Sequence, residues 1–206
     1  MLFALLFAVS DVEISQPQGV AMPISQPSGG RGARTLVSGF ALSIKGTAML
    51  PQTPMGSVGG DVTFMMALTS ELDLFAGSRL ALADKNGTVV PYVGARWGHS
   101  FNGRTFLGIE LAVSSAFPFA NLQSVTWFIE PALLATFTPL RWLELTAGLH
   151  ALSAPQLDLW AVGPGLQAAF RVAERVSLLA EMKTLLLRDR TGYHPSPSVA
   201  LGVAFH

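Results

Sequence analysis

The chain contains no cysteine among its 206 residues, and only 13% of the residues are charged. The lack of cysteine excludes disulfide bonds and thiolate metal sites. The charged share is about half of that in an ordinary soluble domain. The charges also balance, with 13 basic and 13 acidic residues, and no basic cluster marks a surface for nucleic acid. We therefore expect no nucleic-acid partner.

Long apolar runs are also missing, although 50% of the residues are hydrophobic. Gly, Pro, Ser or a charge interrupts every apolar run before it reaches the roughly 18–20 residues that a membrane-spanning helix requires. Mean hydropathy is nevertheless high, at +0.45. A chain this apolar is either a globule with a very large core or a closed barrel whose apolar residues face lipid.

The first 33 residues differ in composition from the rest of the chain. Residues 1–10 are apolar and end in Ala8-Val9-Ser10, the small-x-small pattern of a secretory cleavage site. Because the usual basic start is missing, two interpretations remain: a signal peptide with a truncated start, which we expect, or a buried N-terminal segment. Residues 11–33 are rich in Gln, Pro, Ser and Gly, which predicts a flexible tail. Residues 34–206 are then the folded domain.

From residue 34 onward, large apolar residues alternate with small or polar ones in short segments. Each segment is long enough for the roughly 9–11 residues of a tilted spanning strand, and turn signals such as Asn102-Gly103 separate them. We expect about ten strands: residues 36–48, 59–69, 71–82, 88–98, 104–117, 123–137, 141–152, 157–171, 175–187 and 196–205. Residues 118–122 and 188–195 are expected to be the long connections.

Charged residues in these segments lie on the face opposite the large apolar side chains. Gly, Ala, Ser and Thr dominate that face, whereas a solvated sheet face, the alternative, would be rich in Lys and Glu. Small residues with isolated charges of both signs fit the lumen of a narrow barrel. The lumen charge network is predicted to comprise Lys45, Asp73, Arg79, Arg96, Glu110, Glu130, Glu144, Glu181 and Lys183. Within it we expect Arg96 to pair with Glu110 or Glu130, and Lys183 to reach Glu144.

Aromatic residues and prolines add two further observations. None of the four tryptophans lies in the middle of a predicted strand, as expected for rings at the two membrane interfaces: these are Trp97, Trp127, Trp142 and Trp160. Trp142 has inward parity and is an exception unless the turn reorients it.

Pro91, Pro131 and Pro164 lie inside predicted strands, where each removes one backbone N–H donor from the hydrogen-bond ladder. We expect each to mark a bulge or a misplaced boundary, so the strand count is eight or ten.

The last segment alternates most clearly, with four large residues on one face: Val199, Leu201, Val203 and Phe205. Together with the alternating strands, the short turns and the Trp placement, this ending resembles the small bacterial outer-membrane β-barrels of the OmpA-like and porin-like superfamily. The pattern and the resemblance imply an all-β, closed, antiparallel, up-and-down transmembrane barrel of eight to ten strands, ten being preferred, with a lipid-facing apolar exterior.

The resemblance also implies an integral location in the bacterial outer membrane, with both termini on the periplasmic side. The last segment would pair with residues 36–48 to close the barrel, and its four large residues would serve as the assembly signal. The implied partners are outer-membrane lipids, including lipopolysaccharide, and the barrel-assembly machinery.

No motif in the chain defines a chemistry. His150, Ser153 and Asp158 flank one predicted outer loop and have the residue types of an acyl-transfer triad, but their spacing matches no lipase signature. The four histidines have no metal-ligand spacing, and we expect neither a metal nor a cofactor. Side chains fill the lumen of so narrow a barrel. We therefore expect a non-enzymatic structural or surface-interaction protein. The alternatives are a lipid-modifying enzyme, a narrow solute channel and a soluble lipocalin-like carrier.

Overall fold

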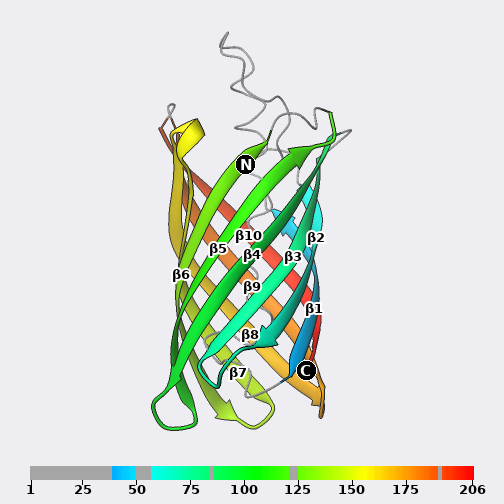
Figure 1. The fold of residues 1–206 in the computed structure, drawn as a ribbon, viewed down its shortest axis with the longest axis vertical. Coiled ribbons are helices and arrows are strands. Elements are labelled where there is room, and N and C mark those ends of the chain that lie inside the picture. Colours follow the sequence, from blue (N-terminus) through cyan, green and yellow to red (C-terminus); the bar gives the residue numbers. More distant parts are fainter. Residues whose placement is uncertain (1–38, 50–56, 84–85, 121–124, 190–191) are drawn as a thin grey trace.

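The computed structural model describes residues 39–49, 57–83, 86–120, 125–189 and 192–206. These residues form a closed barrel of ten strands, in which each strand pairs with its sequence neighbours and β1 pairs with β10 (Figure 1). The strands are β1 Phe40–Met49, β2 Ser57–Ala67, β3 Leu72–Ala83, β4 Asn86–Ser100, β5 Thr105–Pro118, β6 Thr126–Leu140, β7 Leu143–Ala154, β8 Leu159–Ala173, β9 Val176–Asp189 and β10 Gly192–Phe205. The predicted ten-stranded all-β barrel is confirmed. The predicted signal peptide and tail, residues 1–33, lie outside the described residues.

The period-two alternation decides which side chains face outward. On β5, Leu107, Ile109 and Leu111 are 44%, 52% and 50% exposed, whereas the intervening Glu110 is 1% exposed. Large apolar side chains that stay exposed on a closed barrel have lipid as their natural surroundings. The predicted lipid-facing exterior is confirmed. A lipocalin-like carrier would place these residues inside, so that alternative is wrong.

Strand β10 closes the barrel against β1 in an antiparallel ladder from Leu42–Phe205 to Met49–Ser198. The predicted pairing of the last segment with the first is therefore confirmed. The predicted long connection at residues 188–195 is wrong, because β9 continues to Asp189 and β10 begins at Gly192. Pro195 and Pro197 pair with Leu186 and Thr184 of β9 and precede Ser198, the first β10 residue in the described ladder to β1.

The three internal prolines lie within strands without shifting the register. Pro91 pairs with Ser78 of β3, Pro131 with Leu111 of β5, and Pro164 with Leu149 of β7. On its other side, each proline coincides with a gap in the ladder, and pairing resumes beyond the gap in the same register. All three side chains are exposed. The expectation of a bulge or a misplaced boundary is wrong, because a single missing donor is absorbed by one local gap.

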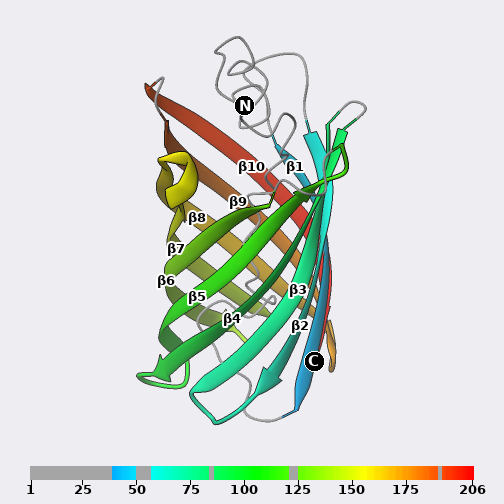
Figure 2. The same cartoon turned by 45° about the horizontal axis from the view of Figure 1, so that its top comes forward.

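The described connections at the end of the barrel that holds the C-terminus are all short. At the end that holds the C-terminus, residues 68–71, 101–104, 141–142 and 174–175 form short turns (Figure 1). In one of them, the Asn102 side-chain oxygen accepts hydrogen bonds from the N–H groups of Arg104 and Thr105, and Gly103 has φ +71°. The opposite end carries the 3₁₀ turn Pro155–Leu157, which projects from the rim in Figure 2. Short turns are typical of the periplasmic end of an outer-membrane barrel, the side on which the C-terminus was expected.

The described residues contain no helix long and apolar enough to cross a membrane.

Candidate functional site

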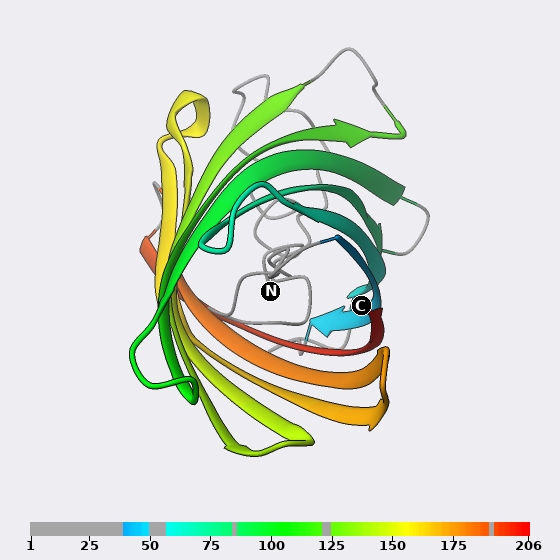
Figure 3. The same ribbon diagram turned by 60° about the horizontal axis from the view of Figure 1, so that its bottom comes forward.

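The candidate site is the inner wall of the barrel, which Figure 3 shows from the short-turn end. Strand parity turns the predicted charges toward this wall, and all of the predicted lumen charge network except Glu144 is buried. Glu144 is half-buried. Asp61, Tyr92 and His150, which have the same inward parity, are also buried on the inner face. Burying a charge is costly unless it is paired, so the partners of these residues decide what the site can do.

Arg79 of β3 is the centre of the largest cluster. Its guanidinium lies 2.8 Å from the Glu130 carboxylate of β6 and 3.8 Å from that of Asp61 on β2. It also lies over the Tyr92 ring, with its Cζ atom 4.6 Å from the ring centroid. The Ser114 hydroxyl donates a hydrogen bond to the other oxygen of Glu130, at 2.5 Å. The cluster joins side chains of five successive strands, β2 to β6, into one buried network.

Tyr92 of β4 extends over β3 to reach β2. Its hydroxyl donates to the Asp61 carboxylate at 2.9 Å and lies 2.6 Å from the Thr63 hydroxyl. Gly77 lies directly beneath it, since Gly77 pairs with both Tyr92 and Thr63, and a Cβ at Gly77 would meet the Tyr92 hydroxyl. The small residues of the inner face therefore make room for larger side chains that lie across them.

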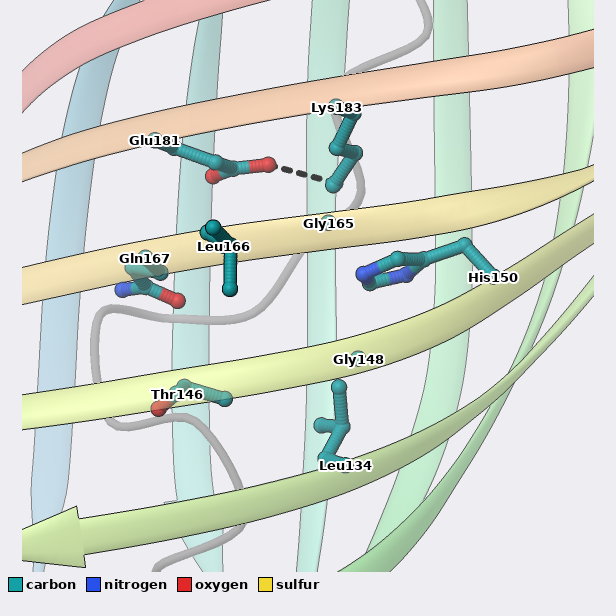
Figure 4. Close-up of a pocket in the computed structure, with 9 residues that line it drawn as sticks. All are labelled: Leu134, Thr146, Gly148, His150, Gly165, Leu166, Gln167, Glu181 and Lys183. Atoms are coloured by element: carbon teal, nitrogen blue, oxygen red, sulfur yellow. Dashed lines mark ion pairs between the residues drawn. The ribbon is translucent and has the colours of Figure 1, made fainter.

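A second cluster lies on the opposite wall. Lys45 of β1 forms a 3.4 Å ion pair with Glu181 of β9, past the intervening β10, and Glu181 also pairs with Lys183 at 2.5 Å. Figure 4 shows this pair beside His150. The imidazole lies against Gly148 and Gly165, where an added Cβ would come within 2.6 Å of its Nε2 atom. The space left between these groups, about 10 Å³, is close to the minimum that one water molecule needs.

The observed ion pairs differ from the predicted ones. Arg96 pairs with Asp73, its direct neighbour across the β3–β4 ladder, at 3.0 Å. Glu130 pairs with Arg79 instead of Arg96, whereas Glu110 does lie opposite Arg96 across the β4–β5 ladder. Lys183 pairs with Glu181 of its own strand instead of Glu144. Parity places a residue on the inner face, but the partner depends on how far each side chain extends across that face.

The predicted interface aromatics lie at the two ends of the barrel. Trp97 and Trp142 are near the short-turn end, whereas Trp127 and Trp160 are in the first residues of β6 and β8, near the opposite end. Trp142 is 51% exposed. It belongs to the turn before β7, so the inward parity expected from the strand pattern does not apply to it. Its ring stacks on that of Phe170, with centroids 6.4 Å apart.

The structure does not assemble the residues considered for acyl transfer. His150 is buried on the inner face of β7, whereas Ser153 has the opposite parity and lies on the outer face. Asp158 follows the 3₁₀ turn with φ 50°. A triad needs its base and its nucleophile within hydrogen-bond reach, and the wall of the barrel separates these two.

No protein-family profile and no curated protein matches this sequence. Among solved structures, a NanC porin is 13% identical, with a TM-score of 0.44, over 80% of this chain and 99% of that one. The KdgM porin, in complex with disordered oligogalacturonate, is 12% identical, with a TM-score of 0.46, over 80% and 98%. An anion-selective porin from Comamonas acidovorans is 12% identical, with a TM-score of 0.41, over 77% and 58%. The likeness lies in the barrel fold alone; an OmpA-like relationship stays a prediction.

Proposed function

We propose that this outer-membrane barrel acts without catalysis, as a structural or surface-interaction protein whose lumen is closed by its charge network. The observation that carries the proposal is the ion pair between Arg79 and Glu130, which spans the inner face between strands that are not neighbours. Both side chains are at most 2% exposed. The two side chains project into the lumen from β3 and β6, and their bridge narrows the space open to solutes.

The second cluster supports the same proposal from the opposite wall. Lys45, Glu181 and Lys183 pair with one another. Two ammonium groups therefore share the Glu181 carboxylate, which offsets part of the cost of burying them inside the wall. Open water-filled pores are a feature of much wider barrels of about 16–18 strands, whereas side chains can fill narrow ones.

Planar-bilayer recording tests the proposal. The wild-type barrel should give no stable single-channel steps, because the Arg79 cluster blocks the lumen. The double variant Arg79→Ala, Glu130→Ala removes both arms of the bridge and should produce measurable steps. Glu71→Ala, which removes an exposed carboxylate at the short-turn end, is the matched control and should behave as wild type. Large stable steps from the wild-type protein would contradict the proposal.

A narrow channel is the second candidate function. The observation that favours it is the mixed polar lining of a ten-stranded barrel, slightly wider than the eight strands at which side chains just fill the interior. The same recordings separate the two functions. A channel requires wild-type conductance that depends on ion charge, and that selectivity should change when Lys45 or Glu181 is neutralised.

A further inference from the structure

An arginine lies on the lipid-facing side of the barrel, where apolar residues otherwise predominate. Arg188 belongs to the outward face of β9, in line with the exposed Leu186 and Met182, and its side chain is exposed. It lies near the end of the barrel opposite the C-terminus. No ion pair among the described residues involves it. A cation in this position needs a partner supplied by its surroundings.

Two aromatic residues flank Arg188 at the same level of the barrel. Trp160 of β8 lies opposite it in one ladder, and Tyr193 of β10 lies opposite it in the other. The guanidinium carbon is 5.8 Å from the Trp160 ring and 5.9 Å from the Tyr193 ring. The two rings meet edge to face over β9, with centroids 6.0 Å apart at 81°. The three side chains therefore form one compact group across three strands.

This arrangement positions the charge without using its hydrogen-bonding groups. Cation–π contacts act through the ring faces, so the N–H donors of the guanidinium remain available for a planar, bidentate contact with an anion. Phosphate oxygens match the spacing of these donors. Two rings that restrict the long arginine side chain also reduce the entropy that binding would otherwise cost.

The position of these three side chains along the barrel axis indicates which anion they would meet. The next outward residues toward the middle of the barrel are Val162, Leu186 and Pro195, all apolar. The row of Trp160, Arg188 and Tyr193 therefore marks the edge of the apolar belt, where amphipathic rings lie at headgroup level and an arginine costs little. Outer-membrane barrels have short turns at the periplasmic end, and the same orientation here places this edge at the outer leaflet.

We propose that Arg188, Trp160 and Tyr193 form a binding site for the phosphate group of a phosphorylated glycolipid in the outer leaflet. The phosphate binds the guanidinium, the rings hold the guanidinium in place, and the acyl chains extend along the apolar wall below. The site lies on the exterior and is independent of whether the lumen conducts.

Native mass spectrometry in detergent tests the site, with diphosphorylated lipid A and its dephosphorylated form as probes. The wild-type barrel should bind the phosphorylated lipid about tenfold more tightly, as expected for one charge-assisted contact. Arg188→Gln should abolish this preference, and Arg188→Lys, which keeps the charge but not the planar fork, should retain part of it. Arg104→Gln removes an exposed arginine at the opposite end and should leave the preference unchanged.

Heat-modifiable migration on a denaturing gel checks that each variant is folded. The proposal is overturned if folded Arg188→Gln keeps the wild-type preference, if the wild-type barrel does not distinguish the two lipids, or if Arg104→Gln loses the preference equally.

Discussion

Arg79 on β3 and Glu130 on β6 meet at 2.8 Å, although β4 and β5 separate their strands in the sheet. Backbone ladders tie each strand only to its two neighbours. This ion pair adds a connection between distant parts of the wall, and Asp61 and Tyr92 extend it to β2 and β4. The stability of the barrel should therefore depend on the inner face as well as on the ladders.

Replacing Arg79 with alanine should lower the thermal stability of the barrel strongly. The variant leaves Glu130 and Asp61 buried without their cation, and breaking a buried pair in this way costs about 3–5 kcal/mol. The measurement is the temperature at which the folded band disappears in heat-modifiable migration. Glu71→Gln is the control, because its 2.8 Å pair with His99 is exposed and should contribute about 0–1 kcal/mol. Equal effects of the two variants would contradict the prediction.

Replacing Gly77 with alanine should also destabilise the barrel, because the new Cβ would meet the Tyr92 hydroxyl and the Val62 carbonyl. Overpacking of this kind costs about 1–3 kcal/mol. Gly46→Ala is the matched control, since the nearest atom to its added Cβ, the Leu201 carbonyl oxygen, is 3.9 Å away. The same thermal measurement compares them, and the prediction fails if Gly77→Ala is as stable as Gly46→Ala.

Parity in the sequence was sufficient to place residues on one face or the other. It assigned Lys45, Glu110 and Glu181 to the lumen and Leu107 to the lipid side, because successive side chains of a strand point to opposite faces of the sheet. It could not identify partners. The bridge from Arg79 to Glu130 depends on which strands face each other across the lumen, and no local pattern in the sequence encodes that distance.

For the prolines, the sequence rule predicted a distortion that the structure does not have. The rule that a central strand excludes proline predicted bulges, yet Pro131 keeps its register between Leu111 and the β7 ladder. A missing N–H affects one side of a strand only, and the outward pyrrolidine ring suits the lipid face. The local rule describes the cost of proline correctly, but the paired neighbours of a closed barrel hold the register.

Pro164→Ala should therefore change stability little, whereas Ala168→Pro should be severely destabilising. Both residues have the same parity on β8, but Pro164 already coincides with a gap in the ladder to β9, while Ala168 pairs with Ala180 across an intact one. A proline at Ala168 removes a ladder donor and should cost about 3 kcal/mol or more, by analogy with a helix interior. Thermal unfolding in detergent compares the two variants. Similar losses of stability would contradict the prediction, because the gap in the ladder at Pro164 would then make no difference.

Phe205→Ala should impair assembly in the cell more than folding in detergent. Phe205 ends β10, pairs with Leu42 of β1 and Val176 of β9, and presents a ring that is 44% exposed. If assembly depends on this residue at the end of β10, its replacement should leave unfolded chains in cells although the purified variant still refolds. Val199→Ala removes a similar lipid-facing side chain from the same strand, at 38% exposure, and serves as the control. The measurement is the heat-modifiable fraction in outer membranes and after refolding. The prediction fails if the two variants give the same heat-modifiable fraction in membranes. It also fails if Phe205→Ala refolds in detergent as poorly as it assembles in membranes, which would mean that Phe205 stabilises the β1–β10 pairing.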